Sequence, residues 1–398
     1  MKKILLRSFF VCILAHLHVA TFAQDSSHLR ISLLTCTPGE ELYSTFGHTA
    51  IRVTDSSLSF NDENRDIVYN YGTFNFDDDG FYLKFIKGKL LYYISQENFE
   101  DVIVGDSIQY GFKHQYEYTN RGITEQVLNF SPVEKINIQH ALKENIKEEN
   151  KYYKYDFFFD NCTTRPRDMI VKYKIDPITF KAVMPAGTTF RDAIHQYLDK
   201  NNKHWSKLGI DLLLGQPCDG VMTTTQSQFL PDNLMKTLDS SNLDHSLVLS
   251  EKNLYPIEDT SSKMDLFTPL VIFSILLLTI ILISFKNTTW AIRFLQGFDG
   301  LFFFLTGAIG IVLLFMWNAT DHAMCRNNYN LLWALPTHVI LAFFVRSRKS
   351  WVKKYYLITA ILSLILLLAW FFLPQQMNDA FIPIVLLLTF RSYRIYAN

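Results

Sequence analysis

Two residues far apart in the sequence carry side chains that could act together as a nucleophile and a base. Cys162 follows an aromatic run and stands where a helix is predicted to begin. A thiol at a helix N-terminus experiences the positive end of the helix dipole, which favours the thiolate. His48 follows a glycine and is predicted to begin a strand. Because the Cys and His of thiol enzymes are neighbours in space rather than in sequence, their long separation is compatible with a catalytic pair.

The residues around Cys162 favour chemistry over packing. A lone buried Cys is more often an inert small hydrophobic residue. Asn161, Arg165 and Arg167 make this turn polar, however, and the two arginines are expected to favour the thiolate further. A third residue should orient the imidazole, and Asn70, in a strand expected beside that of His48, is the candidate.

Other residues of catalytic type are interpreted as structural. His140 and His195 lie on predicted amphipathic helices, and Asp211 is more often a cap or an internal hydrogen-bond partner than a catalyst. Neither a CxxC motif nor a His/Cys spacing typical of zinc occurs, so the sequence predicts no metal and no cofactor.

The elements that would position the pair predict an α+β domain. Segments rich in β-forming residues predict strands at 30–35, 49–53, 66–71, 90–95 and 123–128. A capping box at Ser131 and Glu134 opens a helix that continues to about 147, and further helices are expected at 162–173, 189–198, 207–214 and 231–238. The polar stretch from 239 to 265 is interpreted as a linker or stalk, with the domain itself covering 24–245 and the linker proper 246–265.

The N-terminus predicts export. Lys2, Lys3 and Arg7 precede an apolar run at 9–19, and small residues at 21–23 suit a signal peptidase, so residues 1–23 are predicted to be a signal peptide. An uncleaved anchor is the alternative, and it leaves the domain on the same side. The formal net charge of +0 gives no indication of a nucleic-acid partner.

The C-terminal part predicts an all-α membrane domain of five helices, over 266–391, with a cytoplasmic tail at 392–398. The apolar runs are 266–285, 301–317, 331–345, 356–373 and 381–390. The third and fifth are shorter than the roughly 20 residues that a perpendicular helix needs. Basic residues gather in alternate loops, at 286–293, 346–354 and 391–394. The positive-inside rule therefore predicts an inner-membrane protein with residues 24–264 in the periplasm.

A polar loop between the second and third runs is expected on the periplasmic side. Within it, Asp321, His322 and Arg326 could bind a phosphate head group, although an ordinary polar turn is the alternative. Outside the predicted signal peptide, cysteines occur at 36, 162, 218 and 325. In an oxidising compartment a disulfide such as Cys36 with Cys218 is allowed but does not follow from the spacing.

Taken together, these segments resemble the Lnb-type bacterial lipoprotein N-acyltransferases. The matching motifs are LLTCTPG at 33–39, ELYSTFGH at 41–48, YNYGTFNF at 69–76, DNCTTR at 160–165, FLPD at 229–232 and, in the membrane part, NYNLLWALP at 328–336. The resemblance implies a circularly permuted papain-like (NlpC/P60-like) fold, related to the lecithin:retinol acyltransferases, with His48 and Cys162 as the catalytic residues.

The implied reaction moves a fatty acyl chain from a membrane phospholipid to the α-amino group of the N-terminal lipidated Cys of a diacylated lipoprotein. Two alternatives stay open on the residues alone. The same fold and pair would suit a membrane-tethered cysteine peptidase or amidase that acts on peptidoglycan. The chain could also be a non-enzymatic envelope scaffold in which Cys162 is structural.

Overall fold

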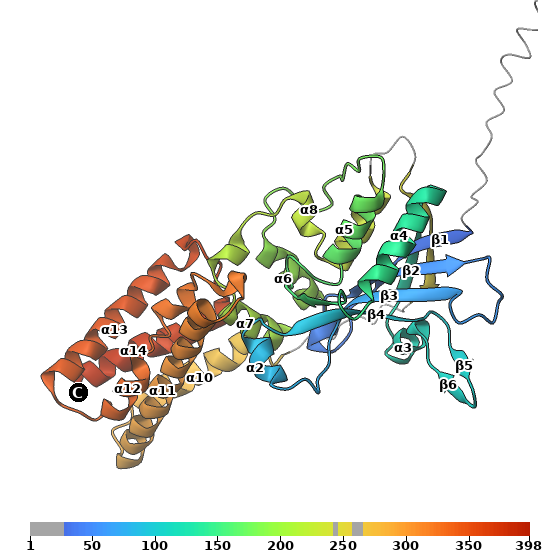
Figure 1. Cartoon of the computed structure of the whole chain (residues 1–398). Helices are drawn as coiled ribbons and strands as arrows, with labels where there is room; N and C mark the ends of the chain where they lie inside the picture. Colours follow the sequence, from blue (N-terminus) through green and yellow to red (C-terminus); the bar gives the residue numbers. More distant parts are fainter. Residues whose placement is uncertain (1–27, 242–245, 257–265) are drawn as a thin grey trace, which may run out of the picture.

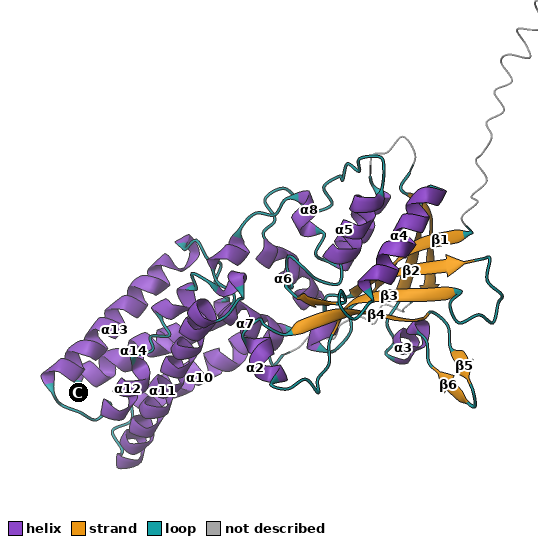
Figure 2. Ribbon diagram, viewed as in Figure 1, coloured by secondary structure: helices purple, strands orange, loops and turns teal. Residues whose placement is uncertain are grey.

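The computed structural model of the chain describes residues 28–241, 246–256 and 266–398, and the predicted signal peptide lies outside these ranges. The molecule is elongated, with a β-sheet and its covering helices at one end and a bundle of long helices at the other (Figure 1). Strands are confined to the first of these parts, whereas the bundle is entirely helical (Figure 2). The predicted order of an α+β domain followed by a helical region is confirmed.

The sheet has seven strands in the order β8-β4-β3-β2-β1-β7-β9, and every neighbouring pair is antiparallel. The strands are β1 (Leu29–Cys36), β2 (His48–Asp55), β3 (Asp66–Thr73), β4 (Leu91–Asn98), β7 (Ile123–Leu128), β8 (Tyr152–Lys154) and β9 (Val248–Tyr255). All five strands predicted from the sequence are present. The register sets Cys36 opposite His48 and Ala50 opposite Asn70.

The edge strand β9 corrects the first part of the linker predicted over 246–265, and residues 257–265 lie outside the described residues. Its residues pair with β7 through the backbone, while most of its side chains are exposed. An edge strand that buries little apolar surface carries no alternating hydrophobic pattern, and this is why its sequence resembles a polar linker. A separate hairpin of β5 (Val102–Val104) and β6 (Ser107–Gln109) projects from the domain (Figure 1).

Helices cover both faces of the sheet. On one face the apolar side chains of α4 (Pro132–Asn145), α5 (Thr164–Tyr173) and α9 (Pro231–Asp239) join the core formed by alternate residues of the central strands. On the other face α3 (Phe112–Tyr118) packs on Leu34, Cys36 and Ala50. The predicted capping box of α4 is present, with Ser131 and Glu134 each accepting the other's backbone N–H.

The bundle contains α10 (Pro269–Ser284), α11 (Thr289–Ala319), α13 (Ser350–Ala369) and α14 (Ile382–Ala397). Within the described residues, three helical stretches are long and apolar enough to cross a membrane, Thr289–Ala319, Ser350–Phe372 and Asp379–Ala397, and α10 is a shorter apolar helix. The third predicted run, 331–345, forms short helical turns around α12 (His338–Leu341) and includes Pro336. Five membrane spans therefore stay a prediction.

The arrangement of the bundle agrees with the predicted orientation. The connection between α10 and α11, which carries Lys286, and the C-terminus lie at the end of the bundle farthest from the sheet (Figure 1). Arg391, however, is not a free loop cation. Its guanidinium is buried and makes two bonds to the Asp299 carboxylate, at 2.7 and 2.8 Å, and one to the Ser284 hydroxyl at 2.7 Å.

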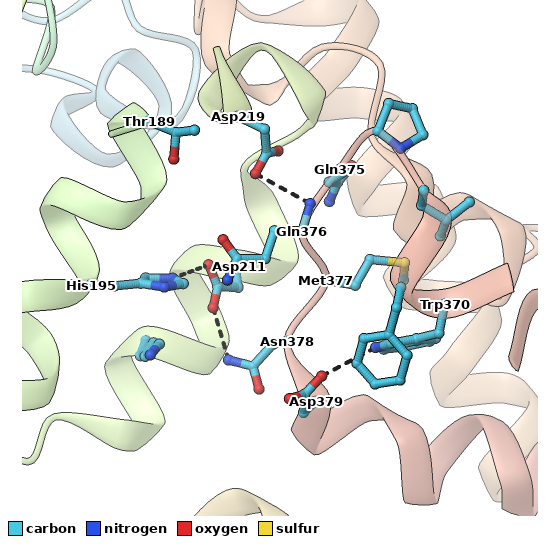
Figure 3. Close-up of a pocket in the computed structure, with 14 residues that line it drawn as sticks. Thr189, His195, Asp211, Asp219, Trp370, Gln375, Gln376, Met377, Asn378 and Asp379 are labelled. Carbon is cyan, nitrogen blue, oxygen red and sulfur yellow. Dashed lines mark hydrogen bonds and ion pairs between the residues drawn. The ribbon is translucent and has the colours of Figure 1, made fainter. Parts of the chain in front are cut away.

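A buried polar junction joins the two parts of the chain. Arg191 on α6 (Phe190–Lys200) is 0% exposed and donates to the carboxylate of Asp211 on α7 (His204–Leu213) at 2.8 Å. From the membrane domain, Asn378 donates to the other oxygen of Asp211 at 2.8 Å (Figure 3). Asn328 donates to the backbone carbonyl of Leu212, also at 2.8 Å. Asp211 is thus an internal hydrogen-bond partner, in agreement with the sequence interpretation.

Removing the cation of this junction should destabilise the protein strongly. We expect Arg191→Met to lower the free energy of unfolding by about 3–5 kcal/mol, because Asp211 then stays buried without its charged partner. The thermal unfolding midpoint of the full chain in detergent measures this loss. Lys207→Met is the matched control, since Lys207 pairs with Asp199 in a partly exposed position and such pairs contribute about 0–1 kcal/mol. Equal midpoints for the two variants would contradict the assignment.

Candidate active site

The turn before α5 holds Cys162 through the side chain of Asn161. The Asn161 carbonyl oxygen accepts the backbone N–H groups of Thr163 and Thr164, each at 2.8 Å. Its amide donates to the backbone carbonyls of Phe157 and Phe229 at 2.8 and 2.9 Å. Asn161 is buried, and it therefore fixes the direction in which the half-buried Cys162 leaves the turn.

The sulfur lies against the beginning of β2. The hydroxyls of Thr49 and Thr163 are 3.2 Å apart, and the Thr49 backbone N–H is among the groups that lower the pKa of the Cys162 thiol. In β3, Gly72 has a φ of +91°, and a Cβ added there would lie 3.3 Å from the Cβ of Cys162. A glycine at this position therefore allows the turn to approach the sheet closely. Since Thr49 follows His48, the structure brings the two predicted residues into one region.

His48 is held by a chain of polar side chains that crosses three strands. Its Nε2 is 3.1 Å from the Asn70 carbonyl oxygen, and the Asn70 amide donates to the Glu97 carboxylate at 2.5 Å. Gln115 on α3 donates to the other Glu97 oxygen at 2.7 Å. Because the Asn70 amide faces Glu97, its oxygen faces His48, and the His48 Nε2 carries the proton. The His48 Nδ1 is then free to accept a proton.

Both members of the pair are neutral in the free protein. Burial, with a smaller contribution from the positive charge of Arg121, lowers the pKa of His48 to about 4 against the hydrogen bond to Asn70. Burial raises the pKa of the Cys162 thiol, although the Thr49 N–H, the Thr163 side chain, its own N–H and Arg121 act in the opposite direction. Cys162 is thus a thiol and His48 a neutral imidazole in the free protein.

This result corrects the expectation that the helix end, Arg165 and Arg167 hold Cys162 as a thiolate. Arg165 makes two bonds to the Asp160 carboxylate, at 2.6 and 2.8 Å, and lies over the Tyr153 ring at 3.4 Å. Arg167 pairs with Asp168 at 2.7 Å. Both guanidinium charges are therefore compensated by carboxylates, and burial of the sulfur outweighs them.

Two residues near the pair were missed by the sequence analysis. Arg121 lies over the Tyr116 ring at 4.6 Å and donates to the Thr37 carbonyl at 2.9 Å. Burial raises the pKa of Glu97 to about 7 against its hydrogen bonds to Asn70 and Gln115. The alternation of β4 places Glu97 on the face of the sheet that carries Asn70. That signal needs the strand register, which the sequence alone does not provide.

The predicted head-group residues meet the exported domain away from Cys162. Asp321 pairs with Lys154 at 2.5 Å, and His322 donates to the Phe85 and Ile86 carbonyls at 3.3 and 3.1 Å. The Arg326 side chain is exposed. The loop thus faces the exported domain, whereas a role in binding a head group stays a prediction for all three residues.

The four described cysteines, Cys36, Cys162, Cys218 and Cys325, are all free thiols. Cys36 lies opposite His48 in the sheet, whereas Cys218 packs with Phe158 and Phe229 beneath the membrane loop. The disulfide between Cys36 and Cys218 that the sequence allowed is therefore not formed. In the described parts of the chain, no group of three or more His, Cys, Asp or Glu side chains could hold a metal ion.

A cavity of about 490 Å³ opens at the junction between the two domains (Figure 3). His195 and Asp211 line it from the exported domain, and Trp370, Gln375 and Asn378 line it from the membrane domain. The His195 Nε2 is 2.8 Å from the Asp211 carboxylate, so its polar groups bind one another. Neither Cys162 nor His48 borders it.

Fold and site together define a membrane protein with a periplasmic α+β domain in which a cysteine lies beside a histidine-bearing strand. The family description "Lnb N-terminal periplasmic domain" matches residues 18–196, and "Lnb transmembrane domain" matches residues 260–398. The chain belongs to the Lnb family. No curated protein and no solved structure matches it.

The neutral state of the pair gives a pH prediction. We expect the rate of Cys162 alkylation by iodoacetamide to rise continuously from pH 6 to above 9, because only the thiolate reacts and the raised thiol pKa keeps it scarce. Protonation of His48 near pH 4 should produce no reactive ion pair. Peptide mass spectrometry after timed quenching measures the rate, with buried Cys218 as the internal reference. A reactivity plateau between pH 4 and 8 would indicate a thiolate–imidazolium pair instead.

Proposed function

We propose that the chain is a lipoprotein N-acyltransferase with Cys162 as nucleophile and His48 as base. The observation that carries the proposal is the contact between the hydroxyls of Thr49 and Thr163, 3.2 Å apart, which brings the residue after His48 against the residue after Cys162. Membership of the Lnb family and the rigid junction with the membrane domain support a substrate that lies in the bilayer. The inner membrane is its proposed location.

In the first half-reaction the His48 Nδ1 takes the thiol proton while the Cys162 sulfur attacks the ester carbonyl of a phospholipid. The tetrahedral adduct collapses, the C–O bond breaks, and the imidazolium returns the proton to the leaving alkoxide. The products are a thioester on Cys162 and a lysophospholipid. A neutral imidazole suits this step, because a base with its pKa lowered to about 4 is unprotonated in the periplasm.

In the second half-reaction the α-amino group of the lipidated N-terminal Cys of a diacylated lipoprotein attacks the thioester. His48 accepts a proton from the amine and passes it to the departing Cys162 sulfur, so the free thiol is restored and an amide is formed. Asn70 is the proposed positioning residue, because its hydrogen bond to the His48 Nε2 leaves the His48 Nδ1 directed away from Asn70.

The negative oxygen of each tetrahedral adduct needs hydrogen-bond donors. Asn161 already occupies the N–H groups of Thr163 and Thr164, which excludes the first turn of α5 as the source. The N–H groups of Cys162 and Thr49 lower the pKa of the thiol and are the donors we assign to the oxyanion. Arg121 supplies the nearby positive charge.

Loss of either member of the pair should abolish N-acylation. We expect lipoproteins from cells with Cys162→Ser or His48→Ala to carry two acyl chains in place of three, as measured by mass spectrometry of their N-terminal peptides. Cys325→Ala is the matched control, because Cys325 is a buried free thiol, and three chains should persist there. Three chains in the Cys162→Ser cells would overturn the proposal. Peptidoglycan fragments released by the intact protein would favour the hydrolase.

Replacing Arg121, the cation near Cys162, should slow catalysis because less of the thiol is then ionised. We expect Arg121→Gln to raise the pKa of Cys162, since the Arg121 charge lowers it in the free protein. A thiol whose pKa is higher by about one leaves about tenfold less thiolate at a fixed pH. The pH profile of Cys162 alkylation measures this change. Arg121→Lys keeps the charge and should leave the profile close to that of the unmodified protein, so equal displacement in both variants would show a packing effect only.

A further inference from the structure

The short helix α2 (Phe81–Ile86) leaves most of its apolar side chains uncovered. Tyr82 is 76% exposed, Leu83 56%, Phe85 52% and Ile86 44%, and the preceding Phe76 is 64% exposed. Contiguous apolar patches of this kind mark surfaces that contact a partner or a membrane. We define this set of five side chains as the α2 patch.

The position of α2 indicates what covers the patch. His322, which follows the end of α11 by three residues, donates to the carbonyls of Phe85 and Ile86 at 3.3 and 3.1 Å. The next residue along the loop toward α11, Asp321, donates its N–H to the Lys87 carbonyl at 3.0 Å. Because α11 is long and apolar enough to cross the membrane and ends at Ala319, α2 lies where that helix leaves the bilayer. Figure 1 places α2 between the sheet and the bundle.

We propose that the α2 patch lies in the outer leaflet of the membrane, so that α2 is an interfacial helix of the exported domain. The charges around it suit this depth. Lys84 and Lys89 are exposed, and long lysine side chains can cover apolar surface while their ammonium groups reach the phosphates. Three aspartates at 77–79 precede the helix and restrict it to a shallow position.

A series of aromatic rings connects the patch with the nucleophile. Phe81 on α2 lies 5.9 Å from Phe74, which lies 5.3 Å from Tyr92, and Tyr92 stacks on Tyr155 at 4.3 Å between ring centroids. Tyr155 and Cys162 both border Gly72, within 3.6 and 3.3 Å of the position of its missing Cβ. This step rests on the proposed function. These rings form an apolar surface along which an acyl chain extends from the leaflet to the sulfur.

Photolabelling of the intact protein tests the membrane contact. The full chain is reconstituted into vesicles of phosphatidylethanolamine and phosphatidylglycerol that contain a phospholipid with a diazirine near the ester end of its acyl chain. After irradiation and digestion, peptide mass spectrometry should find label on residues 81–86 at a level at least fivefold above that on the β5–β6 hairpin. The hairpin is the matched control, because Ile103 and Ile108 are 79% and 59% exposed but lie far from the bundle (Figure 1). Equal labelling of α2 and the hairpin would overturn the inference.

Two variants separate this inference from the proposed function. Cys162→Ser should keep full labelling of α2, because membrane contact does not need the thiol. Leu83→Glu should lose most of that label, whereas Ile103→Glu should leave it unchanged. If lipoprotein acylation is normal but α2 is not labelled, only the inference about α2 is contradicted. If α2 is labelled but lipoproteins carry three acyl chains in cells without this chain, only the proposed function is contradicted.

Discussion

The relative position of the two domains depends on the buried carboxylate of Asp211. It is 1% exposed and receives hydrogen bonds from Arg191, His195 and Asn378, of which the last belongs to the membrane domain. Burial raises the pKa of Asp211, but His195 and Arg191 outweigh it and keep the pKa below its usual value. Because Asn378 binds this carboxylate from the membrane domain, separating the domains breaks a buried hydrogen bond to a charged group. The junction is therefore held by direct hydrogen bonds between the two domains.

Packed aromatic rings connect this junction with the turn that holds Cys162. Phe190 begins α6, the helix that carries Arg191, and its ring lies 5.6 Å from that of Phe158. Phe158 in turn lies 5.3 Å from Phe229, whose carbonyl accepts a hydrogen bond from Asn161. Met324 of the membrane loop packs into the same cluster. The direction of Cys162 is thus tied to the membrane domain through contacts that span both parts of the chain.

The sequence predicts local structural features here far better than it predicts which charges are neutralised by a neighbouring residue. The strand patterns and the Ser131 capping box follow from short motifs, because alternation and capping act over a few residues. The contact of His48 with Asn70 was expected from the adjacency of two predicted strands. The state of Cys162 does not follow from such motifs, because it depends on carboxylates that neutralise the neighbouring arginines and on burial by distant strands. Arg121 was missed for the same reason. Its charge matters only because the fold brings it near the pair.

The raised pKa of Cys162 has a consequence for a protein whose exported domain lies in an oxidising compartment. A permanent thiolate is the form that oxidants attack, so a protonated sulfur at rest is protected. The pKa of the Cys36 thiol is raised to about 12, mainly by burial and to a smaller degree by charge on Cys162. Cys36 therefore stays a thiol as well. On the proposed mechanism the thiolate is needed only while an ester carbonyl occupies the site, when the oxygen of the adduct accepts the N–H groups of Thr49 and Cys162. On the proposed mechanism the Cys162 sulfur attacks more slowly than a permanent thiolate would, but it is protected from oxidation between turnovers.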